Sequence, residues 1–513
     1  MNEVAELFHV APVTVFNWVK EGILELDEAR LVTEESIERF KRQCAGKKKL
    51  HARANKQLKD GFDNIEVYKT IQKALSEDQF DDALGDRYES MLSESFKNRE
   101  GIFYTPMPIV EDMMSDVEID ANTLFLDPCC GSGNFLVQAL EKGVVPENLY
   151  GFDTDPNAVM IARRRIKALT GCDAPHVVCA DFFQACPNLN LSFDLIFTNP
   201  PWGKKLSQAQ RADFAKRYQA GSSTDTCSLF LFPILSVLKS GGVTGMLMPD
   251  SFFKIAAFEN ARKTVLQQTI LQIKDYGKPF KNMYSAVSLV LKQGGNVDHN
   301  MVKCCFNHLE YLRSQQSFMV MPRHNFNYWT KPEEMLMVED FLRKPYLTLK
   351  GSATWSLGIV TGNNTGMCKR SQKKGYKAVY RGKDVFPGRL AAASLFLNPD
   401  DFPRYQQMAS IALLRAPVKL VYRFISSSLV FYCDTQQRYF LNSANMLVLD
   451  EEFPLSAKQL TDVMNSPLTN WLFKQLFNTH KVLRSDLEML PVITDSALHR
   501  RFNLFYFGGQ AFK

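Results

Sequence analysis

The segment that most constrains the fold is a short apolar run followed at once by a glycine-rich turn. It reads Leu-Phe-Leu-Asp-Pro-Cys-Cys-Gly-Ser-Gly-Asn-Phe over residues 124–135. The apolar run predicts a buried strand, and the stretch from Phe135 to Glu141 predicts a helix. Gly131 and Gly133 permit a tight turn and let a ligand approach the backbone closely. Backbone N–H groups at the start of the helix attract the negative end of such a ligand.

Further apolar runs alternate with helical stretches between about residues 86 and 300. The runs are 149–153, 193–197, 242–248 and 286–291. Strands that alternate with helices predict an α/β fold with a mainly parallel, doubly wound sheet.

Length and local composition predict several domains. A chain of 513 residues holds three or so domains at about 150 residues each. Composition changes predict a small N-terminal module over 1–45, a basic helical connector over 46–85, the α/β region over 86–300, and a basic, aromatic region of mixed α+β structure over 301–513. Gly294-Gly295 marks the last of these boundaries.

Overall composition excludes several classes of protein. With 45% hydrophobic and 23% charged residues the chain is not broadly disordered. No apolar run reaches the roughly 18–20 residues of a membrane span, and the N-terminus has no signal-peptide pattern. Eleven cysteines without a CxxC pair predict neither a disulfide scaffold nor a zinc site. We therefore expect a protein of the reducing cytoplasm without a membrane partner or a bound metal.

Positive charge is concentrated in two places. Between Lys41 and Lys59 there are eight Lys/Arg and no Asp/Glu, and between Phe341 and Phe440 there are sixteen Lys/Arg against four Asp and no Glu. A hundred-residue segment with this imbalance favours a polyanionic partner over a merely solvated face.

An acidic residue follows the second predicted strand. Asp153 lies twenty residues after Gly133, where doubly wound folds place the acid that accepts hydrogen bonds from ribose hydroxyls. Because the loop is neither GxGxxG nor a Walker loop, its sequence argues against dinucleotides and ATP. We expect a different nucleotide-like cofactor.

The fourth predicted strand ends in Asn199-Pro200-Pro201-Trp202. Prolines stop the strand and rigidify the neighbouring carbonyls. The Asn199 side-chain oxygen and the Pro200 carbonyl could accept both hydrogens of an exocyclic amine on an aromatic base, which would localise the lone pair of the amine and make it a nucleophile. Such a base must leave its duplex, and Trp202 would stack on its face.

The glycine loop and the following Gly-Phe-Asp-Thr-Asp-Pro resemble the S-adenosylmethionine-binding motif of class I methyltransferases, whose core is Rossmann-like. The resemblance implies that the Asp127–Gly133 loop holds the methionine end of the cofactor, and Asp153 the ribose. It also implies that Asp181 reads the adenine amine while Phe182 packs on the adenine ring. From the residues alone, Asp181 and Phe182 also fit a helix N-cap and a core aromatic. The loop residues assigned to the cofactor are Asp127, Pro128, Gly131 and Gly133.

The order of motifs resembles that of gamma-class N6-adenine DNA methyltransferases, with the signature (N/D/S)PP(Y/F/W). Residues 86–89 and 101–106 resemble the segment that precedes the cofactor loop in type I and type IIG modification enzymes, which implies that Thr105 binds the methionine moiety. Phe280 matches the aromatic that sandwiches the flipped base opposite Trp202, and Tyr284 competes for that role.

Segments of the C-terminal region resemble target-recognition domains of the same class, so double-stranded DNA is the expected partner. Five of them are 357–362, 380–384, 417–423, 439–443 and 484–491. Lys369, Arg370, Lys373 and Lys374 would neutralise phosphates, and Arg381, Lys383 and Arg423 are candidates for reading base edges.

About 25 residues within the module over 1–45 resemble the helix-turn-helix of the MerR and excisionase winged-helix families. In such modules the second helix enters the major groove, which would project Thr14, Asn17 and Lys20 toward DNA. A helical cap that contacts protein is the alternative.

The family resemblance predicts a bacterial DNA adenine methyltransferase in a restriction–modification system whose endonuclease is another chain. Methylation of RNA or of a protein glutamine is an alternative, because NPP-type enzymes act on both. A DNA-binding regulator with an inactive methyltransferase core is a second alternative, against which the intact Asn199, Trp202, Asp127 and Asp153 argue.

Overall fold

The computed structural model describes residues 24–27, 31–44, 84–92, 103–203, 206–221, 225–280 and 285–507, with residues 4, 15, 19, 69, 70, 73 and 97. The chain divides into two compact units, of which the first spans Met1–Pro249 and Tyr276–Gly295 and the second Asp250–Asp275 and Asn296–Lys513. Most of the expected N-terminal module and basic connector lies outside the described residues, apart from α3 (Glu34–Cys44), residues 24–27, 31–33 and 84–85, and single positions. Of the described helices, none is both long and apolar enough to cross a membrane.

A mainly parallel sheet organises the first unit. Its strands lie in the order β3-β2-β1-β4-β5-β7, and only β7 runs antiparallel to its neighbour β5. The strand bounds are β1 Phe125–Asp127, β2 Leu149–Asp153, β3 Val177–Cys179, β4 Phe193–Thr198, β5 Leu238–Pro249 and β7 Ala286–Lys292. The predicted α/β class is confirmed. Because β1 lies between β2 and β4, the strand order reverses there, which opens a crevice at the carboxyl ends of the strands.

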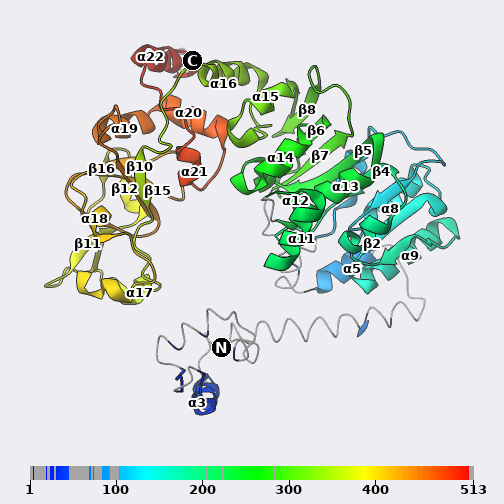
Figure 1. The fold of residues 1–513 in the computed structure, drawn as a ribbon, viewed down its shortest axis with the longest axis horizontal. Helices are drawn as coiled ribbons and strands as arrows, with labels where there is room; N and C mark the ends of the chain where they lie inside the picture. Colours follow the sequence, from blue (N-terminus) through cyan, green and yellow to red (C-terminus); the bar gives the residue numbers. More distant parts are fainter. Residues whose placement is uncertain are drawn as a thin grey trace. The chain divides into compact units, whose positions relative to one another are not determined.

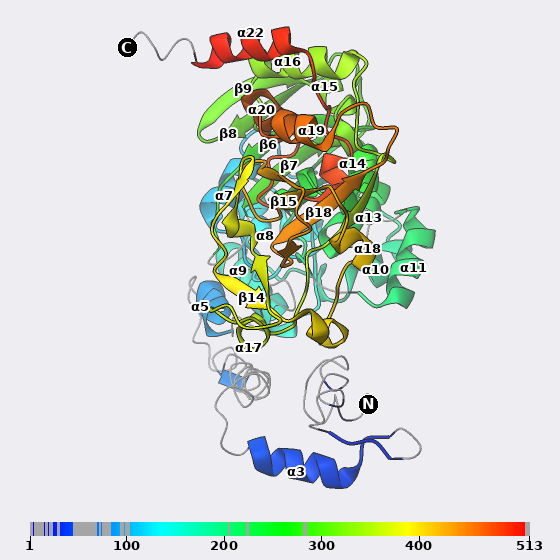
Figure 2. The same cartoon turned by 90° about the vertical axis from the view of Figure 1, so that its left-hand side faces the viewer.

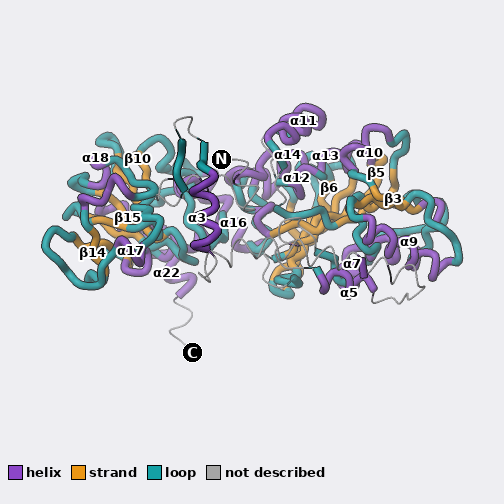
Figure 3. Tube along the Cα trace, turned by 90° about the horizontal axis from the view of Figure 1, so that it is seen from below, coloured by secondary structure: helices purple, strands orange, loops and turns teal. Residues whose placement is uncertain are grey.

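Helices cover both faces of this sheet (Figure 3). α5, α7 and α9 lie on one face, while α10, α11, α12 and α13 lie on the other. The helix bounds are α5 Leu84–Met91, α7 Met107–Met113, α8 Asn134–Glu141, α9 Pro156–Thr170, α10 Phe182–Ala185, α11 Gln208–Tyr218, α12 Thr226–Leu229 and α13 Leu231–Val237.

Local chemistry sets the ends of α9, the helix that follows β2. Asp155 caps it by accepting a hydrogen bond from the Asn157 backbone N–H at 2.9 Å, and Pro156 occupies its first turn. Gly171 ends it at φ 72°, a left-handed conformation that glycine adopts without a Cβ clash.

The second unit contains short strands and helices, and two apolar clusters lie among its elements from residue 321 onward. Its strands are β6 Thr269–Asp275, β8 Met301–Phe306, β9 Leu309–Ser314, β10 Ala353–Ser356, β11 Lys377–Tyr380, β12 Val385–Phe386, β13 Arg389–Leu390, β14 Leu395–Leu397, β15 Lys419–Arg423, β16 Phe431–Asp434, β17 Tyr439–Phe440 and β18 Ala444–Leu449. Its helices are α14 Glu259–Val265, α15 Gln316–Met319, α16 Pro332–Arg343, α17 Asn364–Met367, α18 Ile411–Leu414, α19 Ala457–Met464, α20 Pro467–Leu476, α21 Arg484–Leu487 and α22 Ser496–Phe507. Figures 1 and 2 both show α16, α20 and α22 at one end of this unit and α17 at the other.

Three segments that resembled target-recognition domains meet in this unit. The Ile359 N–H donates to the Phe440 carbonyl at 2.7 Å, and the Leu441 N–H donates to the Tyr380 carbonyl at 2.8 Å. Gly382 is required at this junction, because a Cβ there would lie 2.2 Å from the Ser443 carbonyl oxygen. Backbone pairing therefore connects segments around residues 359, 380 and 440.

Candidate active site

A pocket of about 510 Å³ lies within the first unit, at the carboxyl ends of its central strands. It is lined by residues of the glycine loop, of the ends of β2 and β3, and of the Asn-Pro-Pro-Trp motif. The predicted site residues among them are Thr105, Asp127, Pro128, Gly131, Asp153, Asp181, Phe182, Asn199 and Pro201. The fold thus gathers in one cavity predicted site residues that lie up to 96 positions apart, from Thr105 to Pro201.

The glycine loop closes tightly on the residues that precede it. Gly131 has φ 51°, and a Cβ at this position would lie 2.8 Å from a ring carbon of Tyr104. Its N–H donates to Asp153 Oδ2 at 2.8 Å. Gly133 does not line the pocket; it caps α8 at φ 92°, and a Cβ there would lie 2.9 Å from that of Ala162. Gly131 shapes the pocket wall, whereas Gly133 allows α8 to pack closely on α9.

A second acid, Asp155, stands beside Asp153 in the pocket. Tyr88 on α5 donates its hydroxyl to Asp155 Oδ2 at 2.5 Å. The neighbouring Glu89 accepts a hydrogen bond from the Tyr104 backbone N–H at 3.2 Å. These two contacts tie α5 to the pocket wall.

Burial changes the proton affinity of several pocket groups. It raises the pKa of the Asp127 carboxyl to about 7, although the Cys129 N–H donates to this carboxyl at 3.0 Å. Burial also raises the pKa of Asp153, and hydrogen bonds from the Asp155 and Gly131 N–H groups oppose that rise. The pKa of Tyr104 lies well above its usual value, because of burial and then the charges of Asp155 and Asp153.

Asp181 and Phe182 line the pocket and also have structural roles. Asp181 caps α10 by accepting from the Phe183 N–H at 2.9 Å. Phe182 is 2% exposed and stacks on Phe230, with ring centroids 6.1 Å apart. Asp181 is therefore a helix N-cap and Phe182 a core aromatic, as the residues alone also suggested. The expected contact of both with a cofactor adenine stays a prediction.

The Asn199 amide is oriented by the segment that precedes the glycine loop. Its Nδ2 donates to the Phe103 carbonyl at 2.8 Å. With its nitrogen engaged there, the side chain keeps Oδ1 as a hydrogen-bond acceptor beside the pocket. The adjoining Pro200 is buried, and Pro201 is half-buried.

Trp202 and Phe280 lie in contact beside Asn199. Both rings are largely buried, and they meet edge to face with centroids 5.6 Å apart. The Trp202 indole N–H donates to the Leu247 carbonyl at 3.2 Å. Phe280 also contacts Phe103, at 5.5 Å between centroids. This contact leaves no room for a third ring between Trp202 and Phe280. Tyr284, the other candidate, lies outside the described residues.

Several pocket residues were not predicted as site residues. They are Phe103, Tyr104, Cys129, Asn134, Asp155, Phe183, Gln210, Phe214 and Phe230 among others. Phe103 and Tyr104 immediately precede Thr105, within the segment 101–106 that resembled modification enzymes. That resemblance could have marked both residues as pocket residues. Gln210 and Phe214 lie on α11, and no motif marked that helix.

The predicted DNA-binding residues lie in the second unit. Arg370, Lys373, Lys374 and Lys383 are exposed, and Lys369 is half-buried. Arg381 is engaged within the protein, because its Nε lies 3.0 Å from Asp384 Oδ2 and an Nη donates to Ser394. Arg423 donates its Nε to the Val385 carbonyl at 2.7 Å.

Known proteins share both parts of this architecture. A family model described as N-6 DNA Methylase matches residues 79–274, and one described as TaqI-like C-terminal specificity domain matches residues 377–492. The Type II methyltransferase M.VspI of Vibrio sp. (strain 343) is 39% identical over 388 residues, which are 75% of this chain and 95% of M.VspI. Among solved structures, the Type IIL restriction-modification enzyme MmeI in complex with DNA matches with a TM-score of 0.55 at 11% identity, over 82% of this chain and 72% of that one. The DrdV–DNA complex matches with a TM-score of 0.52 at 12% identity, over 84% and 60%.

A methyltransferase-type α/β sheet, followed in sequence by a match to a specificity domain, defines a modification enzyme of the restriction–modification class. The chain belongs to the N-6 DNA methylase family and is an N6-adenine DNA methyltransferase homologous to M.VspI. The family confirms the expectation that the substrate is DNA and not RNA or protein.

Proposed function

We propose that the pocket of the first unit binds S-adenosylmethionine and that Asn199 and Pro200 present to it the N6 amine of an adenine flipped out of double-stranded DNA. The observation that carries this proposal is the Asn199–Phe103 hydrogen bond, since it orients the amide with its acceptor free. Methyltransferases of this family use S-adenosylmethionine, which supplies an electrophilic methyl group on its sulfonium.

The chemistry of the pocket fits that cofactor. Thr105 is 4% exposed, and its hydroxyl has no hydrogen-bond partner among the described residues, so a ligand would satisfy it. Asp153 and Asp155 supply acceptors for ribose hydroxyls. Asp181 uses Oδ1 to cap α10, so its Oδ2 could accept a hydrogen bond from an adenine amine. Pro128 and Gly131 would hold the methionine end, and Phe182 would pack on the adenine ring.

The chain's own groups then act on the target amine. Asn199 Oδ1 and the Pro200 carbonyl accept its two hydrogens, so its lone pair localises on nitrogen and points toward the methyl group. Pro200 and Pro201 stiffen the backbone and keep this carbonyl in place. Trp202 stacks on the flipped base, and Phe280 flanks it after the two rings separate.

The second unit chooses the DNA site in this proposal. The match of residues 377–492 to a specificity domain supports that role. The N-terminal helix-turn-helix over 1–45 would add DNA contacts as an accessory module. If the chain acts in a restriction system, its endonuclease is a separate protein.

Incubation of the full chain with labelled S-adenosylmethionine and genomic DNA, followed by modified-base sequencing, tests this proposal. N6-methyladenine at one sequence is expected from the wild type, and an Asn199→Ala chain is expected to be inactive while it still binds the cofactor. Full activity of Asn199→Ala would contradict the catalytic assignment, and label at cytosine N4 would correct the base.

A further inference from the structure

The basic residues of the second unit form two groups once their partners are known. Six of the sixteen Lys/Arg between Phe341 and Phe440 form ion pairs within this unit. These are Arg343, Lys344, Arg381, Arg404, Lys419 and Arg438. The others have no carboxylate partner among the described residues. The Lys and Arg side chains whose charge is most available to a polyanion are therefore those without a carboxylate partner.

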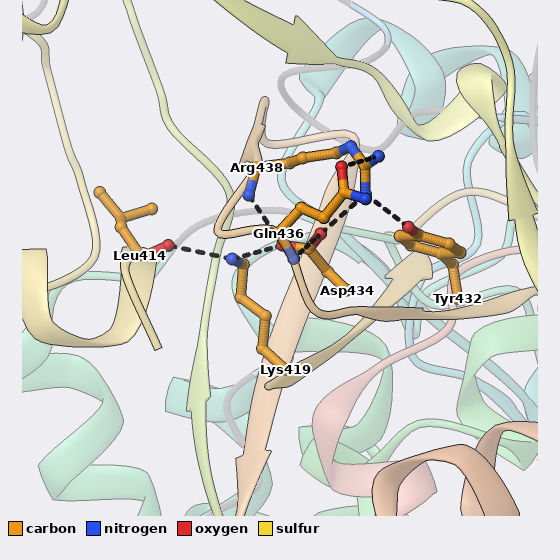
Figure 4. Close-up of polar contacts among 6 residues, drawn as sticks. All are labelled: Leu414, Lys419, Tyr432, Asp434, Gln436 and Arg438. Atoms are coloured by element: carbon orange, nitrogen blue, oxygen red, sulfur yellow. Dashed lines mark hydrogen bonds and ion pairs between the residues drawn. The ribbon is translucent and has the colours of Figure 1, made fainter. Parts of the chain in front are cut away.

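The clearest internal pair is Lys419–Asp434 (Figure 4). Both side chains are fully buried and their charged atoms lie 2.7 Å apart. Arg438 pairs with the same carboxylate at 3.2 Å and donates to the Tyr432 hydroxyl at 2.7 Å. Lys419 is neutralised inside the unit and is excluded as a DNA contact, whereas Arg438 shares the same carboxylate and is partly exposed.

A different arrangement occurs on the β12–β13 hairpin, where two guanidinium groups lie over one aromatic ring. Phe386 and Arg389 are paired across the two strands. The guanidinium carbon of Arg389 lies 4.5 Å from the Phe386 ring centroid, and that of Arg423 lies 5.3 Å from it. Neither arginine has a carboxylate partner in the described part of the chain. The Phe386 ring attracts both guanidinium groups, but it carries no negative charge and so leaves their positive charge in place.

The hairpin is fixed to the rest of its unit. The Gly388 N–H donates to the Phe431 carbonyl at 2.9 Å, and Arg423 Nε donates to the Val385 carbonyl at 2.7 Å. Arg389 is exposed, and no described residue accepts a hydrogen bond from it. A guanidinium keeps its N–H donors in its own plane, where they form a planar fork suited to phosphate oxygens.

We propose that the β12–β13 hairpin contacts the DNA backbone, with Arg389 as a phosphate-binding residue and Phe386 as the positioning residue that holds its guanidinium. The inference rests on the proposed function, in which the second unit binds the DNA site. Arg423 contributes charge beside the same ring. Arg381, which Asp384 and Ser394 hold, is left out of this surface.

Salt dependence of DNA binding by the full chain tests the role of Arg389. The probe is a duplex that the wild type methylates, and its Kd is measured over a series of salt concentrations. Arg389→Ala should bind more weakly at low salt, and the slope of log K against log salt should fall in magnitude by about 0.9, the value for one phosphate contact. Arg389→Lys should restore the slope but not the full affinity.

Arg404→Ala is the matched control, because Arg404 is also exposed but is paired with Asp401 at 3.2 Å. It should leave the slope as in the wild type. An Arg389→Ala slope equal to that of the wild type would overturn the proposal. If the wild type methylates no DNA, the proposed function fails instead, so the two failures are distinguishable.

Phe386→Leu tests the positioning role without a change of charge. It should raise the KM for DNA and leave kcat and the KM for S-adenosylmethionine unchanged. In the Phe386→Leu/Arg389→Ala double variant the two losses should be less than additive, because the ring acts through the arginine. Full additivity with unchanged thermal midpoints would refute that role.

Discussion

Asn199 Nδ2 donates to the Phe103 carbonyl oxygen at 2.8 Å, across 96 positions of sequence. The hydrogen bond joins the end of β4 to the segment that precedes the glycine loop. It also distinguishes the two ends of the amide, since only the nitrogen can face a carbonyl. One backbone contact thereby leaves Oδ1 as the atom of Asn199 that faces the target amine in the proposed function.

This relationship predicts an unusual pH profile for Asn199→Asp. At neutral pH the carboxylate would face the Phe103 carbonyl with no hydrogen to donate, and kcat should fall by about 100-fold, comparable to loss of one group that stabilises a transition state. A protonated carboxyl restores one donor and one acceptor, so activity should recover as pH falls. Single-turnover rates between pH 5 and 8 measure this, with Asn199→Ala as the control that should not recover. An Asp variant with the wild-type rate at pH 8 would show that the donor is dispensable.

Trp202→Phe and Trp202→Ala separate stacking from the indole hydrogen bond to Leu247. The phenylalanine variant keeps a ring, so we expect a modest loss in kcat/KM for DNA. The alanine variant loses base stacking worth about 1–3 kcal/mol. Cofactor affinity should change in neither. Trp329, another buried indole that donates to a backbone carbonyl, offers Trp329→Phe as a control for loss of such a bond elsewhere. If Trp202→Phe, Trp202→Ala and Trp329→Phe changed kcat/KM for DNA equally, stacking of Trp202 on the base would be contradicted.

Asp181→Asn separates the helix cap from the expected contact with adenine. Asparagine caps helices as well as aspartate does, so the free energy of unfolding should stay within experimental error of the wild type. Its Nδ2 cannot accept from an adenine amine, and loss of a hydrogen bond to a charged group, worth about 1.5–3 kcal/mol, should raise the Kd for S-adenosylmethionine at least about ten-fold. Isothermal titration gives the Kd.

Asp225, which caps α12 and does not line the pocket, supplies the control variant Asp225→Asn. Cofactor affinity should be unchanged in it. If Asp181→Asn bound the cofactor like the wild type, the residue would be only a cap.

Asp127 predicts a pH-dependent stability. Burial raises its pKa to about 7, so the folded protein retains a proton that the unfolded chain releases above about pH 4. The stabilisation is fully present below that pH and is lost as pH rises through about 7. The free energy of unfolding of the wild type, relative to Asp127→Asn, should fall between pH 5 and 7 by at most about 1.4 kcal/mol per pH unit. Urea titrations without cofactor measure it.

The exposed Asp173 serves as the comparison, and Asp173→Asn should leave the wild-type pH dependence unchanged. If the free energies of unfolding of the wild type and of Asp127→Asn changed in parallel with pH, the raised pKa of the Asp127 carboxyl would be contradicted.

The sequence predicted the parts of the fold that local patterns encode. Alternation of apolar runs and helical stretches indicated the mainly parallel sheet. The glycines of residues 124–135 marked the turn between β1 and α8, because a Cβ at Gly131 would lie 2.8 Å from a ring carbon of Tyr104. The domain boundaries, the role of each site residue and the N-terminal module stay predictions.

The tertiary structure decided what depends on contacts between distant segments. The run from Phe341 to Phe440 looked uniformly basic, yet folding neutralises Lys419 against Asp434 and leaves Arg389 without a carboxylate partner among the described residues. The sequence named Asn199 but not the Phe103 carbonyl that orients it. Motifs specify residue types along the chain. Which atoms pair, and which charges stay available, depends on burial and distance, and these are set only when the chain packs.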